Sequence, residues 1–274
     1  MMEKKTIPMW LFAGMLSAFL CVTMSSCSDS DESNPGTPAA DTSTLTTFTV
    51  GSVSFNMVAV DGGTFRMGAT YELLGDATDR EKPDHSVTLS SFRIGETEVT
   101  QELWQAVMGT NPSAHQGARL PVEQVSWVDC LDFISKLNAL TGQTFRLPTE
   151  AEWEFAARGG TKRQDHKFSG SNKVNEVAWF QASSGGATHE VGTKLPNELG
   201  IYDMSGNVWE WCKDFYGAYS SESQTNPSGP AMGTFRVIRG GAYDTSFYGC
   251  RVSYRETGTD ENHRSGSCGL RLAL

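Results

Sequence analysis

Four side chains with oxygen atoms that could bind a metal ion lie close together in one short segment of the chain. They are Asp203, Asn207, Glu210 and Asp214. Hard cations take several oxygen ligands, and side-chain oxygens combined with backbone carbonyls suit calcium better than magnesium or zinc. The alternative is that Asn207 only forms a left-handed turn and that Glu210 pairs with an arginine. Neither a helical nor a strand period fits this segment, so we expect a constrained loop here.

Cysteine offers a second route to chemistry. Cys250 precedes Arg251 and Arg255, and nearby positive charge lowers the pKa of a thiol and makes it reactive. In an exported protein the alternative is a disulfide, for which Cys250 has Cys212 and Cys268 as candidate partners. The cysteines of the chain form no CxxC pair, so the sequence does not indicate a structural zinc site.

Histidine and serine motifs give weaker signals. No two of the five histidines lie at a spacing that places them on one face of a helix or strand, so a three-histidine site would need distant loops to meet. The segment Met204-Ser205-Gly206 has only half of the Gly-x-Ser-x-Gly pattern of a nucleophile elbow, and no strand is predicted before it. We therefore expect solvated histidines and no serine nucleophile.

The N-terminal residues predict export and lipid attachment. A basic start, an apolar segment from Ile7 to about Thr23 and small residues before Cys27 are typical of a bacterial lipoprotein signal over 1–26, after which Cys27 is acylated. An uncleaved membrane helix is the alternative, but the apolar segment is short for one. Residues 27–47 are rich in Ser, Asp, Thr and Pro, and we expect a disordered tether. The protein would then lie in the cell envelope, with the membrane as partner through its lipid, in the outer membrane.

The remaining residues, 48–274, are enough for one domain with a sizeable core. The chain has a formal net charge of −10, and removing 1–26 takes away two lysines and one glutamate, which leaves −11. Because nucleic acid repels so acidic a protein, we exclude it as a partner.

Short elements must position the candidate residues. Alternating apolar residues on both sides of Asp61-Gly62-Gly63 predict an antiparallel hairpin over 48–67, and the residues 86–94 predict a further strand. Three helices are predicted from a Ser or Thr that can cap the first turn, and each is followed by glycine. The capping residues are Thr100, Ser126 and Thr149, and the glycines are Gly109, Gly142 and Gly159. Frequent glycine and few long elements predict a compact α+β domain held together by loops.

Together these motifs resemble the sulfatase-modifying factor or formylglycine-generating enzyme family. The matching segments occur in the family's order and span nearly the whole predicted domain: 60–68, 96–100, 121–127, 146–160, 197–211, 239–241 and 269–271. The resemblance implies an irregular, loop-rich α+β fold, similar to C-type lectins, with calcium bound in loops. The implied calcium ligands are Asp203, Gly206, Asn207, Val208 and Glu210, with Gly206 and Val208 acting through their carbonyls and Asn207 shaping the turn or contributing. A weaker match places Asn175 in a second calcium site.

The resemblance also bears on catalysis. Catalytic members use two cysteines, five residues apart, after an Arg-Gly-Gly motif; these bind copper and oxidise a substrate cysteine to formylglycine with O2. Here the first position falls on Thr245 and only the second on Cys250, and a different alignment makes Cys250 a later, disulfide-forming cysteine. One thiol cannot form the two-sulfur site that copper(I) prefers. The three-histidine set of the related iron-dependent branch is also missing, so we predict a non-catalytic relative, with copper-dependent formylglycine generation as the alternative.

The segments 243–249 and 255–268 predict a binding surface for a protein or glycan ligand. They concentrate the residue types of adaptable binding loops. The candidate contact residues are Tyr243, Asp244, Thr245, Phe247, Tyr248 and His263. The segments also resemble the C-terminal regions that diversity-generating retroelements vary in lipoproteins of this fold, and ordinary loop polarity is the alternative.

Overall fold

The computed structural model describes residues 45–70 and 75–274. The predicted signal over 1–26, the acylated Cys27 and most of the predicted tether lie outside the described residues. The first strand already begins at Leu45, so the predicted end of the tether at residue 47 is wrong by three residues. Within the described ranges, no helix combines the length and the apolar character needed to cross a bilayer.

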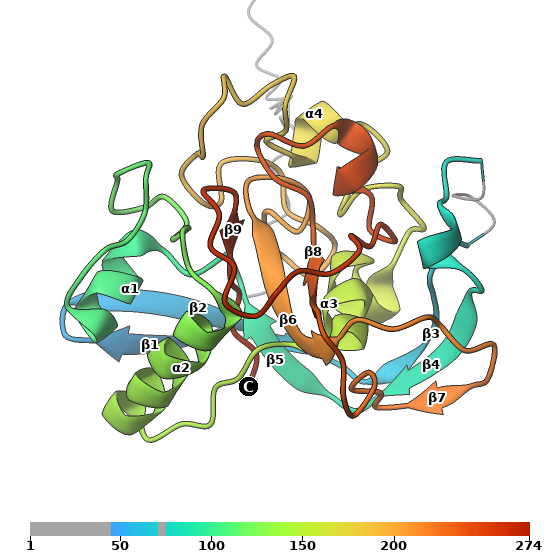
Figure 1. The fold of residues 1–274 in the computed structure, drawn as a ribbon, viewed down its shortest axis with the longest axis horizontal. Coiled ribbons are helices and arrows are strands. Elements are labelled where there is room, and N and C mark those ends of the chain that lie inside the picture. Colours follow the sequence, from blue (N-terminus) through green and yellow to red (C-terminus); the bar gives the residue numbers. More distant parts are fainter. Residues whose placement is uncertain (1–44, 71–74) are drawn as a thin grey trace, which may run out of the picture. The chain divides into compact units, whose positions relative to one another are not determined.

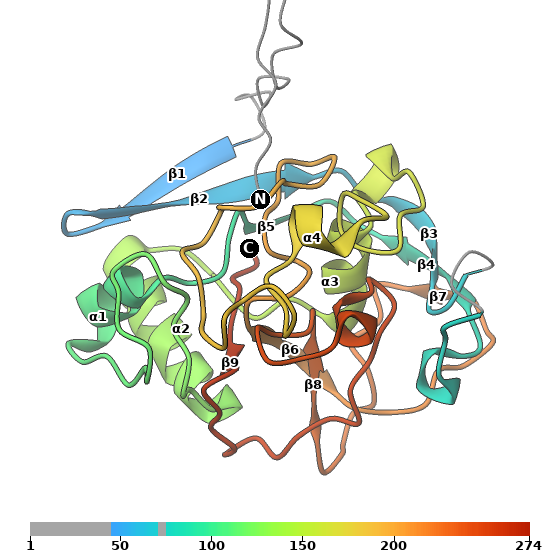
Figure 2. The same cartoon turned by 90° about the horizontal axis from the view of Figure 1, so that it is seen from above.

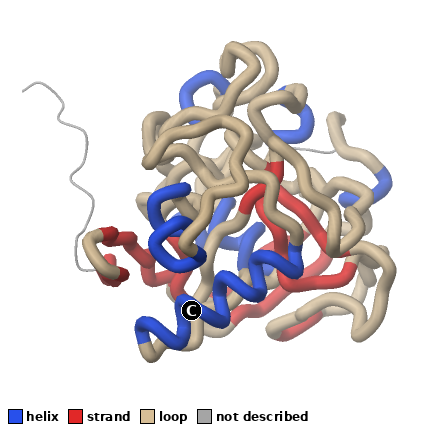
Figure 3. Tube along the Cα trace, turned by 60° about the vertical axis from the view of Figure 1, so that its left-hand side comes forward, coloured by secondary structure: helices blue, strands red, loops and turns tan. Residues whose placement is uncertain are grey.

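Three small sheets of three strands each form the frame of the domain (Figure 1). Their strand orders are β1-β2-β5, β3-β4-β7 and β8-β6-β9. The strands are β1 (Leu45–Val50), β2 (Val53–Val60), β3 (Gly63–Met67), β4 (His85–Leu89), β5 (Phe92–Gly95), β6 (Trp209–Phe215), β7 (Gln224–Thr225), β8 (Arg236–Arg239) and β9 (Cys268–Gly269). Because each sheet is small, loops and turns make up much of the domain (Figure 3), and the predicted irregular α+β class is confirmed.

The predicted hairpin around Asp61 is wrong. The two strands that flank this turn belong to different sheets: β2 pairs with β1 and β5, whereas β3 pairs with β4. The true hairpin turns at Gly51, whose φ of 61° is left-handed. At Gly62 the chain passes so close to the end of β4 that a Cβ would lie 2.6 Å from the Leu89 carbonyl oxygen. The alternation located the strands, but a period of two does not say which strand pairs with which.

The predicted helix starts are confirmed. Thr100, Ser126 and Thr149 each accept a hydrogen bond from a backbone N–H in the first turn of the following helix. The helices are α1 (Gln101–Met108), α2 (Trp127–Thr141), α3 (Glu150–Ala157) and α4 (Val174–Val177), and the 3-10 turns are η3 (Asp79–Glu81), η4 (Gly160–Lys162) and η5 (Phe247–Cys250). Gly109 and Gly142 end α1 and α2 in the left-handed conformation that favours glycine.

The helices divide the core into two main parts (Figures 1 and 2). α1 and α2 pack against β1 and β2, where the Trp104 and Phe133 rings stack with their centroids 4.8 Å apart. α3 packs against β3, β4, β6 and β8 and buries Trp153 completely. Trp211 of β6 is equally buried in the first part, so β6 joins the two cores. The loop that decides function therefore starts from a rigid strand pair, β6 and β8.

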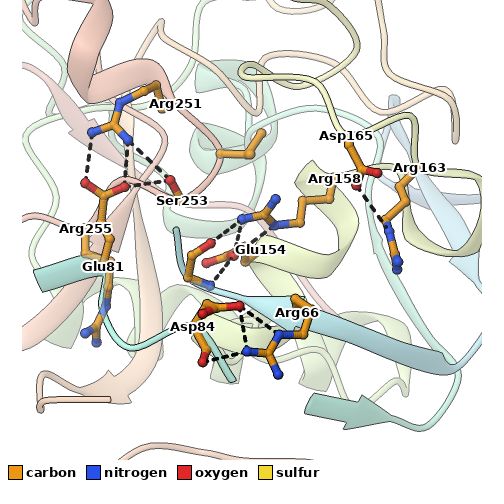
Figure 4. Close-up of polar contacts among 12 residues, drawn as sticks. Arg66, Glu81, Asp84, Glu154, Arg158, Arg163, Asp165, Arg251, Ser253 and Arg255 are labelled. Carbon is orange, nitrogen blue, oxygen red and sulfur yellow. Dashed lines mark hydrogen bonds and ion pairs between the residues drawn. The ribbon is translucent and has the colours of Figure 1, made fainter. Parts of the chain in front are cut away.

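Buried arginine–glutamate pairs connect distant segments inside the domain. Figure 4 shows two of them, Arg251 with Glu81 and Arg158 with Glu154. The closest N–O distances of the buried pairs are 2.7 Å for Arg251–Glu81, 2.6 Å for Arg255–Glu150, 2.6 Å for Arg239–Glu154, 2.8 Å for Arg158–Glu154 and 2.7 Å for Arg271–Glu210. Because a buried charge without its partner is strongly destabilising, each pair constrains where its two segments lie.

Candidate functional site

The loop after β8 carries most of the predicted ligand surface, and the turn at Asn207 supports it. The Tyr243 N–H donates to the Asn207 carbonyl at 2.8 Å. The Asn207 side chain holds the neighbouring loop, since it accepts from the His189 N–H at 3.0 Å and donates to the His189 carbonyl at 3.2 Å. Asn207 has a φ of 61°, which asparagine tolerates better than most residues. Its carboxamide is thus committed to shaping the loops around the surface.

The predicted ligand residues on this loop face solvent. Phe247 is 40% and Tyr248 47% exposed, and their ring centroids lie 4.0 Å apart, so they form one exposed aromatic pair. Asp244 is exposed beside them, while Tyr243 and Thr245 are half-buried. A second loop borders the surface, because the Gln181 N–H donates to the Thr245 carbonyl at 3.0 Å and the Ser184 hydroxyl to the Tyr243 carbonyl at 2.7 Å.

His263 is also exposed, but the structure does not join it to the aromatic pair. Its backbone N–H donates to the Asp260 carbonyl at 2.9 Å, in a separate segment that packs near the start of α2. That segment touches α2 through an exposed pair between Arg264 and Asp129. Among the described residues, no hydrogen bond connects His263 to residues 243–248. We therefore keep the name candidate ligand surface for Tyr243, Asp244, Thr245, Phe247 and Tyr248.

Cys250 lies beneath this surface and is not reactive. It is fully buried in η5, and burial raises the pKa of its thiol to about 12. A Cβ on Gly241 would lie 2.9 Å from its Sγ, which shows how closely the preceding turn covers the thiol. The expectation that Arg251 and Arg255 would lower this pKa is wrong, because both guanidinium groups point to buried glutamates.

The predicted disulfides are also wrong for the described part of the chain. Cys212, Cys250 and Cys268 are all free, as is Cys130. Each is buried in a different packing environment or sheet position, and burial raises the pKa of all four thiols. They behave as small apolar core residues.

The predicted calcium ligands lie together in one turn, but their side chains have different partners. Glu210 is fully buried, and both of its oxygens accept from Arg271, at 2.7 Å for the shortest contact. The Trp153 Nε1–H also donates to Glu210, at 2.7 Å. Of the predicted side-chain ligands in this turn, Asp203 alone keeps a buried oxygen without a partner among the described residues, its Oδ1. Asn175 is exposed on α4, and its carbonyl accepts from Lys194 at 2.8 Å.

Comparison with known proteins places this loop, this turn and the arginine pairs in a family. Residues 46–274 match the Sulfatase-modifying factor enzyme 1-like domain, FGE-sulfatase. The chain belongs to this family. A curated relative, chaperone protein LppX of Paenibacillus barcinonensis, is 34% identical over 269 residues, which cover 80% of this chain and 88% of the relative. The formylglycine-generating enzyme of Streptomyces coelicolor is 30% identical over 285 residues, covering 79% and 88%.

A solved structure is similar to this sulfatase-modifying factor domain over nearly its full length. Treponema denticola variable protein 1 superposes with a TM-score of 0.76 at 36% identity, covering 84% of this chain and 98% of that one. The family resemblance and the fold class predicted from the sequence are thereby confirmed. The relatives include both a formylglycine-generating enzyme and proteins named otherwise, so membership of the family alone does not assign an activity.

Sequence reasoning missed one acid in this family domain, Glu98. It is 2% exposed, and neither of its carboxyl oxygens has a partner among the described residues. Burial raises its pKa well above the ordinary value, and the neighbouring Asp203 raises it further. Burial likewise raises the pKa of Asp203, to about 6. Glu98 stands in the matching segment 96–100, but one acid in a strand end carries no signal of an unpartnered carboxyl group.

Glu98 and Asp203 offer unpartnered oxygens of the kind that calcium takes. The fit to the whole predicted set is partial, because Asn207 and Glu210 are engaged elsewhere. No group of three or more His, Cys, Asp or Glu side chains that could hold a metal occurs in the described ranges. A cation at this position would rely on the two carboxyl groups and on backbone carbonyls of the turn.

Proposed function

We propose that this domain is a non-catalytic, ligand-binding member of the sulfatase-modifying factor family, displayed by a lipid-anchored envelope protein. The observation that carries the proposal is the state of Cys250. The position where a catalytic partner cysteine is expected holds Thr245, and Cys250 itself is buried with a pKa of about 12. At neutral pH only about one molecule in 10⁵ would hold the thiolate that copper(I) requires.

The candidate ligand surface supports the binding half of the proposal. Two adjacent exposed aromatic rings next to Asp244 and Thr245 give an apolar anchor with a polar rim, the pattern that concentrates binding energy in protein interfaces. We favour a protein ligand, because Phe247 can bury apolar area but offers no hydroxyl group to a sugar. The name of the Paenibacillus relative, a chaperone protein, is compatible with protein binding. A glycan is the alternative ligand.

Display of this surface rests on the N-terminal residues. Acylation of Cys27 after cleavage of residues 1–26 would attach the chain to a membrane, and a polar tether would hold the domain away from it. Scaffolding of an envelope assembly is the same role with a permanent partner. We place the protein in the outer membrane of a bacterial envelope.

Calcium is part of the proposal as a structural ion. Asp203 and Glu98 would hold it, with the carbonyls of Gly206 and Val208 completing the site and Asn207 keeping the turn. Its support is three carboxyl oxygens that are buried and have no partner among the described residues. Unpartnered buried polar atoms are costly, and a divalent cation would compensate both charges.

An oxidation assay separates the two functions. The mature protein is loaded with copper(I) and incubated with O2 and a peptide that carries a sulfatase cysteine motif; the Streptomyces enzyme serves as the active control. We expect the peptide to keep its mass, because no two-thiol site can form. Conversion of cysteine to formylglycine by the wild type, and its loss in Cys250→Ser, would establish the oxidase and refute the non-catalytic assignment.

A further inference from the structure

A cavity of about 540 Å³ opens beside the first turn of α3, away from the candidate ligand surface. Its wall comes from the start of β4, the end of β6, α3 and the segment 217–230. None of residues 243–250 lines it. The volume is in the range of small-molecule sites. The cavity is thus a second possible binding site, independent of the proposed function.

The fixed charges in the wall compensate one another. Arg255 donates to both oxygens of Glu150, from Nε at 2.6 Å and from Nη2 at 2.8 Å. Its Nη1 donates to the carbonyls of Arg80 and Gly217, both at 3.1 Å. These contacts occupy most of the guanidinium donors, so the wall has little to offer an anion.

Asp214 differs from the other charged groups in the wall. It is 4% exposed, and its Oδ2 accepts from the Glu150 N–H at 3.0 Å. Among the described residues, no arginine, lysine or histidine forms an ion pair with it. Burial and the neighbouring charge of Glu150 raise its pKa to about 7; Glu152 raises it further, and only Lys213 is close enough to oppose this. A cation beside Asp214 would meet an uncompensated carboxyl group.

Aromatic rings form the apolar part of the wall. His85 packs on Tyr219 with the ring centroids 4.8 Å apart, and Phe215 lies at the end of β6. The Arg255 guanidinium already lies 3.8 Å from the Tyr219 ring centroid. Aromatic faces attract cations and pack well against apolar groups. The wall therefore combines one free acid with an apolar, aromatic surface.

We propose that this cavity binds a small primary amine, whose ammonium group donates to Asp214 and whose apolar body packs against Tyr219 and Phe215. An ammonium group suits the site because it carries both the charge that Asp214 lacks and N–H donors for its carboxylate. A neutral compound of the same shape would fill the cavity without the charge-assisted hydrogen bond.

The test compares 2-phenylethylamine with 2-phenylethanol in NMR titrations of the mature protein at pH 8. We expect saturable binding of the amine, with chemical-shift changes at Tyr219 and neighbouring residues, and a dissociation constant at least tenfold lower than that of the alcohol. In Asp214→Asn, which keeps an oxygen that can accept from the Glu150 N–H, the amine should lose at least tenfold in affinity. Equal affinity for the two compounds would overturn the proposal.

Two further variants control the titration. Asp79→Asn changes an acid whose side chain is fully exposed outside the cavity and should bind the amine as the wild type does. Ser228→Trp places a large ring at the mouth of the cavity without touching the buried pairs and should abolish binding. If Asp214→Asn fails to fold, Ser228→Trp decides: undiminished amine binding in that variant would place the amine elsewhere and refute the site.

Discussion

The buried acids of this domain fall into two groups that have similar burial and different partners. The paired acids, Glu81, Glu150, Glu154 and Glu210, each bind an arginine. The unpaired acids, Glu98, Asp203 and Asp214, have no arginine partner among the described residues. Burial raises the pKa of acids in both groups, but hydrogen bonds and charges from Arg251 and Arg255 bring the pKa of Glu81 and Glu150 below the ordinary value. The unpaired acids keep raised pKa values.

This difference separates structural from binding roles. Glu81 and Arg251 are 170 residues apart in sequence, and Glu210 and Arg271 are 61 apart, so the paired acids hold distant segments in place. The unpaired acids hold no such segment. Their buried oxygens are costly unless a proton, a cation or a ligand compensates them. We infer that the paired acids maintain the fold and that the unpaired acids mark the places where something else can bind.

Breaking a paired acid should have the largest effect. Arg271→Met leaves Glu210 buried with the Trp153 Nε1–H as its remaining side-chain donor and removes the donor to the Gly95 carbonyl. We expect a loss of about 3 to 5 kcal/mol in the free energy of unfolding, measured by urea denaturation. Arg66→Met breaks an exposed pair, with side chains 52% and 36% accessible, and should change stability little. Similar losses in both variants would contradict the structural role of the buried pairs.

The sequence predicted the helix caps and the family, because both depend on local residue types. Thr100, Ser126 and Thr149 satisfy backbone donors only a few residues away. It did not predict which strands pair, nor the partners of the buried acids, because these depend on contacts far apart in sequence. Glu210 illustrates this limit: its spacing left calcium and an arginine both open, and the arginine that binds it comes from the C-terminal segment. Asp214 was singled out as a possible ligand, but its cavity depends on the segment 217–230 and could not be predicted.

Titration of an unpaired acid should give the next largest effect. The pKa of Asp214 is about 7 in the folded protein against an ordinary 3.8, so the folded state holds the proton more tightly than the unfolded state does. The stability from this group is therefore fully present below about pH 4 and is lost as the pH rises to about 7. The change amounts to at most about 4 kcal/mol, at about 1.4 kcal/mol for each pH unit.

Asp214→Asn isolates this contribution. Denaturation curves between pH 4 and 8 should show the free energy of unfolding of the wild type falling relative to that of the variant, mostly between pH 4 and 7. Asp79→Asn, which changes an exposed acid, should follow the wild type. If the curves of wild type and Asp214→Asn stay parallel across this range, Asp214 is compensated by some other group and does not belong with the unpaired acids.

Calcium should give the smallest effect of the three and sharpens the comparison between Asp203 and Glu210. An ion that binds only the folded state at a hundred times its dissociation constant stabilises it by about 2.7 kcal/mol. Removing calcium with a chelator should then lower the melting temperature of the wild type by several degrees, and readding calcium, but not magnesium, should restore it.

The double variant Glu98→Gln, Asp203→Asn identifies the site. Without its two carboxylates the turn should no longer respond to the chelator, while Asp214→Asn should respond as the wild type does, because its acid lies at a different cavity. If the chelator leaves the melting of the wild type unchanged, Glu98 and Asp203 are compensated by a shared proton, since burial and mutual repulsion already favour the protonated form. In that case the double variant should be at least as stable as the wild type above pH 7, where the wild type must either keep its proton or repel.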